Sequence, residues 1–169
     1  MKINVSSIKK EIGSRQPFEF RCGIDQLLEE TDEQWTSGQV LVEGHIANNG
    51  RMLEMEGTVH VKSFPCCGRC LEQYEAEFEF PFHELFQEEV AAATETKDEI
   101  NYFHGDEIDI SAVIRETIVL SEPLRTVCSE DCKGLCSSCG ANLNTETCGC
   151  QHETLDPRLA ALKKLLEKD

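Results

Sequence analysis

Six of the ten cysteines in the chain lie between Cys128 and Cys150. Within that stretch, Cys136 and Cys139 form a C-x-x-C pair that is followed by Gly140. Two thiolates three residues apart can face one metal ion only if the backbone turns tightly. A glycine after the second cysteine permits that turn and lets backbone N–H groups point at the sulfurs. The spacing therefore predicts a zinc knuckle that contributes to a structural tetrathiolate site.

The second ligand pair of this site is predicted to come from the same stretch, either from Cys148 and Cys150 or from Cys128 and Cys132. His152 is a further candidate ligand, because it follows Cys150 by two residues. Iron–sulfur ligation is compatible with the same spacing. Disulfides and buried, unpaired thiols are the competing interpretations. The predicted metal ligands are drawn from six cysteines: Cys128, Cys132, Cys136, Cys139, Cys148 and Cys150.

A second C-x-x-C pair, Cys67 and Cys70, lies in the middle of the chain. It is half of a metal site, a redox pair, or a reduced pair beneath a sheet. Eight thiolates would make two sites, whereas six would serve one site and leave two to spare. A thioredoxin-like role is not favoured, because no βαβ pattern surrounds the pair. Cys22 shares an apolar face with Phe18 and Phe20 and is predicted to be a core residue.

Alternating apolar and polar residues predict the sheet that must position these cysteines. The Asn49-Gly50 pair predicts a hairpin, and Pro81 is expected to end the last strand. The strands would form an antiparallel meander or a partly open barrel, with one buried face and one acidic face in water. Residues 83–107 are expected to be acidic and irregular. The predicted strands cover residues 18–22, 39–47, 52–61 and 74–80.

Three helices are predicted from apolar spacing and capping residues. The main one, capped by Asp109 or Ser111 and carrying an apolar stripe to Leu120, would cover the sheet. A brief helix is expected near residues 6–10, and a terminal helix begins at Pro157. The predicted fold class is therefore α+β, with a small C-terminal zinc-knuckle-like module and a terminal helix.

The predicted domains are an α+β domain with an antiparallel sheet at residues 1–125 and a cysteine-rich metal-binding module with its helix at residues 126–169.

Composition limits the classes of partner. The chain has 169 residues with 32 acidic and 16 basic side chains, a formal net charge of −16. An acidic protein repels a phosphate backbone, so basic proteins are the more natural partners. No apolar run reaches the roughly 20 residues that span a membrane. The first residues lack the apolar core of a signal peptide. A cytoplasmic location is expected, where clustered cysteines favour metal over disulfides.

Two segments resemble the YceD family of large-ribosomal-RNA-subunit accumulation proteins from bacteria and plastids. The first is Cys67-Gly68-Arg69-Cys70-Leu71-Glu72. The second runs from Cys128 through Lys133-Gly134-Leu135-Cys136 and Asn142-Leu143-Asn144 to Cys150, with Asp156-Pro157-Arg158-Leu159 before the terminal helix. The resemblance is greatest to the form found in Gram-positive bacteria. It implies a role in the accumulation of large-subunit ribosomal RNA, and so in ribosome biogenesis.

The function expected from this resemblance is that of a non-enzymatic factor that binds a ribosomal protein or a large-subunit precursor particle. No small-molecule substrate is expected, because H-E-x-x-H, Gly-rich phosphate-loop and G-x-S-x-G patterns are missing from the sequence. A zinc- or thiol-based redox or metal sensor and a zinc or thiol enzyme are the alternatives. The candidates for a local contact with ribosomal RNA are Lys62, Arg69, Lys133, Arg158, Lys163 and Lys164.

Overall fold

The computed structural model describes residues 1–28, 37–89 and 100–150. The chain divides into two compact units. Unit 1 comprises Met1–Cys66 and Gln73–Thr126, and unit 2 comprises Cys67–Glu72 and Val127–Asp169. Unit 2 thus includes a short segment, Cys67–Glu72, that lies in the sequence between the two segments of unit 1. The domain boundary between residues 125 and 126 stays a prediction.

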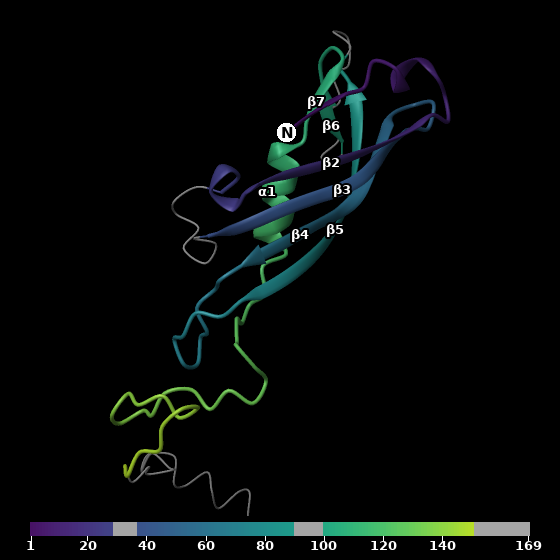
Figure 1. The fold of residues 1–169 in the computed structure, drawn as a ribbon. Coiled ribbons are helices and arrows are strands. Elements are labelled where there is room, and N and C mark those ends of the chain that lie inside the picture. The colour runs from purple at the N-terminus through teal and green to yellow at the C-terminus, as the bar shows by residue number, and fades with distance from the viewer. Residues whose placement is uncertain (29–36, 90–99, 151–169) are drawn as a thin grey trace, which may run out of the picture. The chain divides into compact units, whose positions relative to one another are not determined.

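Unit 1 is built on a five-stranded sheet (Figure 1). Its first four strands form an antiparallel meander, as predicted, while the fifth pairs parallel to its neighbour. The sheet is therefore mixed, and it stays open rather than closing into a barrel. Its strands, in sheet order, are β2 (Arg15–Gly23), β3 (Gly38–Asn48), β4 (Leu53–Ser63), β5 (Ala76–Glu88) and β6 (Asn101–Phe103).

A second, two-stranded sheet pairs β1 (Lys2–Asn4) with β7 (Glu107–Asp109) in antiparallel register. Two 3₁₀ turns complete the N-terminal part of the unit, η1 (Ile8–Lys10) and η2 (Ile24–Gln26). The brief helix predicted near residues 6–10 is thus a single 3₁₀ turn, and the side chain of Ser7 does not cap it. The sequence did not predict β1, because three residues are too few to show a period of two.

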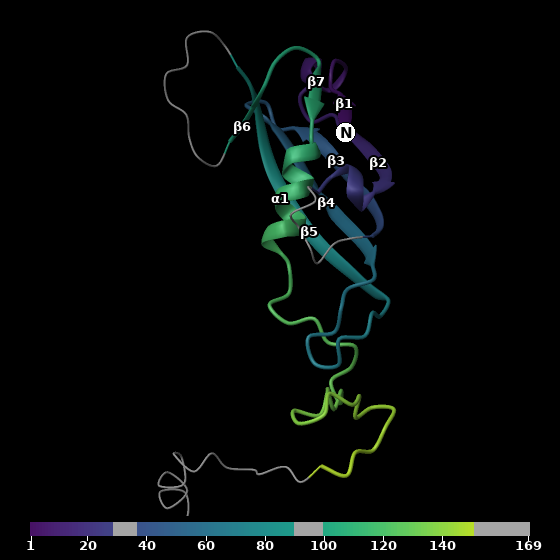
Figure 2. The ribbon, with the colours of Figure 1, turned by 90° about the vertical axis from the view of Figure 1, so that its left-hand side faces the viewer.

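The helix α1 (Ser111–Leu120) packs on one face of the five-stranded sheet (Figures 1 and 2), as the sequence predicts. It is the only α-helix among the residues that the structure describes. The prediction that Asp109 or Ser111 caps the helix is wrong, because the N-cap is Ile110 and no side chain makes a capping bond. Asp109, one residue earlier, accepts a hydrogen bond from the N–H of Ser111 at 3.0 Å. That bond is the main cause that lowers the pKa of Asp109 to about 2. Although Leu120 is part of the predicted stripe, it lies 84% exposed at the end of the helix.

The apolar core lies between the sheet and α1. Inward-facing side chains meet in rows across the strands, because the register places Val42 beside Val59 and Val59 beside Phe80. From the helix, Val113, Ile114 and Ile118 are buried against the sheet. Cys22 packs against this core, as predicted, and burial raises the pKa of its thiol.

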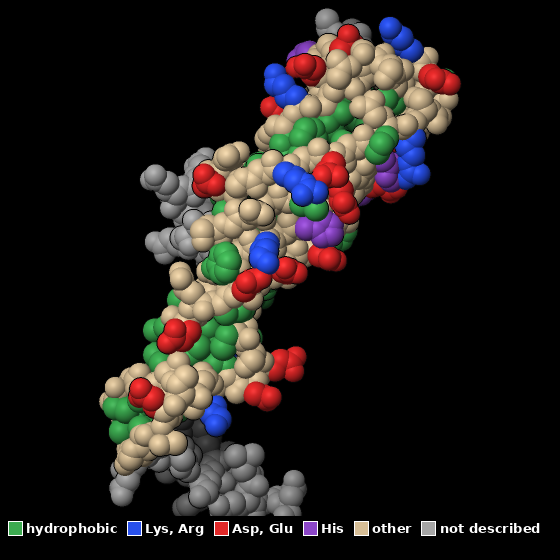
Figure 3. Space-filling view, in the orientation of Figure 1, with side chains coloured by type: hydrophobic (Ala, Val, Ile, Leu, Met, Phe, Trp, Pro, Cys, Tyr) green, Lys and Arg blue, Asp and Glu red, His purple; other side chains and the backbone are tan. Residues whose placement is uncertain are grey.

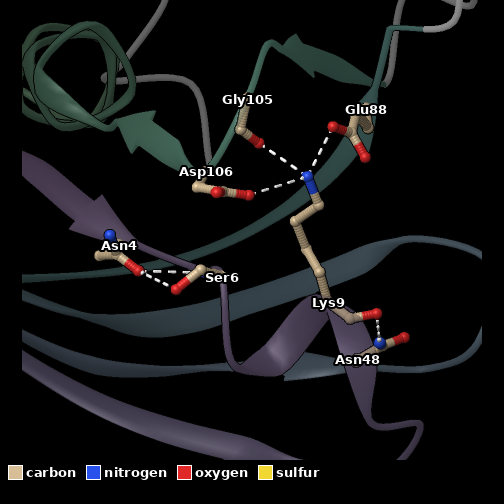
Figure 4. Close-up of polar contacts among 7 residues, drawn as sticks. All are labelled: Asn4, Ser6, Lys9, Asn48, Glu88, Gly105 and Asp106. Carbon is tan, nitrogen blue, oxygen red and sulfur yellow. Dashed lines mark hydrogen bonds and ion pairs between the residues drawn. The ribbon is translucent and has the colours of Figure 1, made fainter.

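Lys9 of η1 connects that turn to the end of β5 and to the residues between β6 and β7 (Figure 4). Its Nζ contacts a carboxylate oxygen of Glu88 at 2.5 Å and the carbonyl oxygen of Gly105 at 2.8 Å. A third contact reaches Asp106 at 3.3 Å. The side-chain amide of Asn48 donates to the carbonyl of Ile8 at 2.8 Å. The N-terminal turn is therefore fixed to both β3 and the end of β5.

The prediction that Pro81 ends a strand is wrong, because β5 continues through it to Glu88. Among the described residues, β5 has a partner at Pro81 only on its β4 side, since β6 pairs with β5 only from Phe86 onward. Proline lacks an N–H donor, and a strand with one open side tolerates that loss. Residues 83–107 are correspondingly less irregular than predicted, since they include the end of β5, all of β6 and the first residue of β7. Residues 90–99 of that segment lie outside the described residues.

The described part of unit 2 contains turns and one isolated bridge, between Leu135 and Asn142, but no longer strand and no helix. The terminal helix predicted from Pro157 lies outside the described residues. In the described ranges, no helix is long and apolar enough to cross a membrane.

Two glycines face each other across the middle of the sheet. Gly44 of β3 pairs with Gly57 of β4, and Phe18 and Phe82 lie on the flanking strands of the same row. A Cβ added to Gly57 would lie 2.4 Å from the carbonyl oxygen of Glu43 and 2.9 Å from the ring of Phe82. The row therefore requires glycine, because backbone and rings approach one another too closely for a side chain.

We expect Gly57→Ala to lower the free energy of unfolding by about 1–3 kcal/mol, the usual cost of overpacking. Urea titration of the strand circular-dichroism signal measures it. Thr58→Ala, on the other face of the same strand, serves as the control and should change stability by less than about 0.5 kcal/mol. Equal stability of the two variants would contradict the assigned role of the glycine row.

Candidate metal centre

The chain forms a tight knuckle at Cys67-Gly68-Arg69-Cys70 in unit 2. The N–H of Leu71 donates to the carbonyl of Cys67 at 2.9 Å, which closes the turn. The N–H of Arg69 points at the sulfur of Cys67, at 3.4 Å. A neighbouring bond, from the N–H of Cys67 to the carbonyl of Glu72 at 2.9 Å, holds the two arms together.

A second knuckle at Cys136–Cys139 repeats this geometry. The N–H of Gly140 donates to the carbonyl of Cys136 at 2.8 Å. The N–H groups of Ser138 and Cys139 both point at the sulfur of Cys136, each at 3.4 Å. The arms are joined from the N–H of Cys136 to the carbonyl of Ala141, at 2.8 Å. The two knuckles therefore share the same backbone geometry. In the sequence, the feature that they share is the C-x-x-C spacing.

Eight cysteines converge in two groups of four, each group with all its sulfurs within 4.8 Å of one another. We call these the first and second sulfur groups. Each takes one knuckle and one further pair of cysteines. The first sulfur group consists of Cys67, Cys70, Cys128 and Cys132, and the second of Cys136, Cys139, Cys148 and Cys150.

The spacing of the sulfurs fits a tetrahedral ion and not a covalent bond. The sulfurs of Cys67 and Cys132 are 3.8 Å apart, and those of Cys70 and Cys128 are 3.7 Å apart. Zinc–thiolate bonds of about 2.3 Å at tetrahedral angles place sulfurs about 3.8 Å from each other. Disulfide sulfurs would be about 2.05 Å apart. In the described residues, no cysteine is joined to another by a disulfide. Each group can therefore hold a metal ion.

Backbone N–H groups favour the thiolate form at the first cysteine of each knuckle. The N–H of Cys70 is the main cause that lowers the pKa of Cys67 to about 6. The N–H of Cys139 lowers the pKa of Cys136 to about 6 in the same way. A hydrogen bond to a charged group stabilises that form, so each knuckle is prepared to present at least one thiolate near neutral pH.

The opposite shift occurs at other members of the groups. The pKa of Cys128 is raised to about 12, chiefly by its hydrogen bond with Cys132. The pKa of Cys150 is raised to about 12, chiefly by its hydrogen bond with Cys139. Crowded sulfurs cannot all carry charge by themselves, because like charges disfavour one another. A divalent cation at the centre reverses this preference and favours four thiolates.

All six cysteines predicted as ligands fall in these two groups, but they do not form one site. Cys128 and Cys132 join the upstream knuckle, and the other four predicted ligands form the second sulfur group. Cys67 and Cys70 were not among the six, although their spacing raised the alternative of two sites, and the sulfurs do gather in two groups. Which of the eight bind a metal stays a prediction. His152 lies outside the described residues.

A family model described as "Large ribosomal RNA subunit accumulation protein YceD" matches residues 55–166, well over half of the chain. This chain belongs to the YceD family. The match includes β5, α1 and every cysteine of both sulfur groups. The resemblance inferred from the two cysteine segments is thereby confirmed.

Relatives of this YceD-family chain occur in bacteria and plants. The uncharacterized protein YlbN of Bacillus subtilis is 28% identical over 158 residues, 92% of this chain and 91% of that protein. An uncharacterized protein of Mycobacterium tuberculosis is 36% identical over 112 residues, 65% of this chain and 54% of its own length. The chain thus spans about half the length of that relative.

A chloroplastic protein of Arabidopsis thaliana named large ribosomal RNA subunit accumulation protein YCED homolog 1 is 42% identical over 62 residues. The aligned part is 37% of this chain and 19% of that protein. No solved structure matches the chain.

Leu71 occupies the place in the first knuckle that Gly140 occupies in the second. Both residues have positive φ, 60° at Leu71 and 76° at Gly140. Leu71 is the only non-glycine residue with positive φ in the described ranges. Its side chain is 63% exposed, so core packing does not account for the leucine. The first knuckle of this YceD-family protein therefore carries backbone strain that the second avoids.

We expect Leu71→Gly to stabilise unit 2 slightly. The change relieves left-handed strain of about 1–2 kcal/mol and increases unfolded-chain entropy by about 0.4–1 kcal/mol. The net gain is therefore between about 0 and 1.6 kcal/mol. The inverse change, Gly140→Leu, introduces strain and should destabilise unit 2 by at least as much. Denaturant titration of the metal-loaded protein compares the two, and effects of the reverse signs would contradict the assigned geometry.

Proposed function

We propose that this chain is a non-enzymatic ribosome biogenesis factor that supports the accumulation of large-subunit ribosomal RNA in the bacterial cytoplasm. The observation that carries the proposal is membership of the YceD family, whose model is named for that role. Chloroplastic proteins of Arabidopsis thaliana and Zea mays that carry the same name align with part of the chain. The factor works by binding a ribosomal protein or a precursor particle.

Unit 2 is proposed to be held together by two structural zinc ions, one in each sulfur group. Four thiolates and tetrahedral spacing are typical of structural zinc, whereas catalytic zinc keeps one position open for water or substrate. Zinc bound there supplies folding energy to a segment that has few backbone pairings of its own. This reading supports a binding role, because a site closed by four cysteines offers no reactive position.

The outer face of the sheet is the proposed surface for a basic protein. It carries more carboxylates than cations, but the two signs are interspersed (Figure 3). Glu56 contacts Arg15 at 3.1 Å and His45 at 2.6 Å, and Glu54 contacts His83 at 2.7 Å. Exposed ion pairs contribute only about 0–1 kcal/mol each. Lysines and arginines of a partner can therefore replace these contacts at little cost.

Direct contact with ribosomal RNA has weaker support. Lys62 forms ion pairs with Glu75 and Glu77. Arg69 donates from Nη1 to the carbonyls of Glu130 and Cys132, at 2.9 and 3.0 Å. These two cations serve the protein's own structure. Among the other candidates for RNA contact, Arg158, Lys163 and Lys164 lie outside the described residues. The charges thus favour a protein component of the particle as the direct partner.

The metal part of the proposal predicts two zinc ions for each chain. Cys67→Ser and Cys136→Ser should each remove one ion, because each substitution leaves three thiolates in one group and four in the other. Native mass spectrometry of the intact chain counts the ions. Cys22→Ser, outside both groups, is the matched control and should retain two. A wild-type chain that carries no metal, or only one ion, would contradict two four-thiolate sites.

The cellular part predicts a deficit of large-subunit RNA when the protein is missing. In the source bacterium, deleting the gene should lower the ratio of large- to small-subunit ribosomal RNA. The wild-type gene should restore the ratio, and so should the Cys22→Ser control. The double variant Cys67→Ser/Cys136→Ser should not restore it. An unchanged ratio after deletion, under conditions of rapid growth, would refute the proposed role.

A further inference from the structure

Asn144 connects the two sulfur groups. It lies in the loop between Cys139 and Cys148 of the second group, yet its side chain contacts the first group. Its Nδ2 donates to the sulfur of Cys132 at 3.3 Å. Its Oδ1 accepts a hydrogen bond from the N–H of Lys133 at 2.8 Å. The loop between two cysteines of the second sulfur group thus supplies a hydrogen bond to a sulfur of the first sulfur group.

Backbone hydrogen bonds hold this loop in place. The N–H of Leu143 donates to the carbonyl of Gly134 at 2.9 Å, and Leu135 forms an isolated antiparallel bridge with Asn142. On its other side, the N–H of Leu135 donates to the carbonyl of Arg69 in the first knuckle, at 3.1 Å. The short segment between the two groups is therefore bonded both to the first knuckle and to the loop that carries Asn144.

We propose that Asn144 is a positioning residue that couples metal binding at the two sulfur groups. This inference rests on the proposed zinc sites. Closing the second group around an ion fixes the loop between Cys139 and Cys148 and so holds the Asn144 amide against Cys132. A hydrogen bond to a ligating sulfur orients and stabilises that ligand. Because coupling between binding sites is reciprocal, an ion in either group raises the affinity of the other.

The two groups draw their ligands from different spans of the chain. All ligands of the second group lie within Cys136–Cys150. The first group joins Cys70 to Cys128, which are 58 positions apart, and unit 1 folds between them. The two ends of that segment are held together within unit 1, where the hydroxyl of Thr126 donates to the carbonyl of Cys66 at 3.0 Å. The first group should bind its ion more tightly once the loop with Asn144 is in place.

The test is a zinc titration of the full chain against a chromophoric chelator, with native mass spectrometry at each step. In the wild type we expect a small fraction of chains with one ion. In Asn144→Ala the affinity of the first group should fall about tenfold or more, within the range seen when such supporting residues are removed. Chains with one ion should accumulate. Thr147→Ala, an exposed position in the same loop, is the matched control and should behave as wild type.

Two further variants separate coupling from a general loss of structure. Asn144→Asp keeps an acceptor for the N–H of Lys133 but cannot donate to the sulfur and places a like charge beside it, so the first group should bind its ion no more tightly than in Asn144→Ala. In a Cys136→Ser background, where the second group cannot close around its ion, Asn144→Ala should change the affinity of the first group less than twofold.

The outcomes distinguish the inference from the proposal on which it rests. If the wild type binds two ions but Asn144→Ala leaves both affinities within twofold, the coupling is refuted and the zinc sites stand. Wild-type behaviour of Asn144→Asp would likewise refute the role of the hydrogen bond to sulfur. If the wild type binds no zinc, or only one ion, the zinc sites and the coupling both fail.

Discussion

Four sulfurs within 4.8 Å of one another cannot all be charged unless a cation lies among them. The described part of unit 2 depends on this constraint, because it has turns and one isolated bridge in place of helices and strands. Each knuckle directs N–H groups at its first cysteine and so favours one thiolate. The raised pKa values of Cys128 and Cys150 show the opposing effect of crowding. A metal ion in each group, as proposed, would resolve this conflict and would link folding of the unit to occupancy of its sites.

Unit 1 depends on a different interaction, the burial of apolar side chains between a sheet and one helix. Its inward-facing rows pack Val42, Val59 and Phe80 side by side, and α1 adds Ile114 and Ile118. This unit has a core that needs no ion. Its outer face carries more carboxylates than cations, interspersed in exposed ion pairs, and the contact with a basic protein that is proposed for it would be exchangeable and salt-dependent.

Patterns with a short period were the parts of the fold that the sequence predicted well. The alternation along β3 and β4 and the apolar stripe of α1 follow from the periods of strand and helix. The continuation of β5 through Pro81 could not be predicted, because it depends on which side of the strand lacks a neighbour at that residue. The pairing of β1 with β7 depends on tertiary contacts between distant segments that three-residue strands do not encode.

The sequence predicted which cysteines belong to the candidate site better than it predicted how they are grouped. C-x-x-C spacing marks both knuckles, but spacing does not say which pairs share an ion. Cys128 and Cys132 lie close to Cys136 in sequence, yet the fold places them with Cys67 and Cys70. The similarity of the two knuckles was not evident from the sequence, because the first has Leu71 at the position where the second has glycine. Asn144 was named only as part of the second segment that resembles the family, and its residue type did not predict its contact with a sulfur twelve positions upstream.

The central claim is that two groups of four thiolates each hold one zinc ion. X-ray absorption at the zinc edge of the purified chain tests it most directly. The account predicts a single shell of four sulfurs at about 2.3 Å around each zinc, with two ions for each chain. A shell that contains nitrogen or oxygen ligands would contradict it, as would a chain that carries disulfides and no zinc.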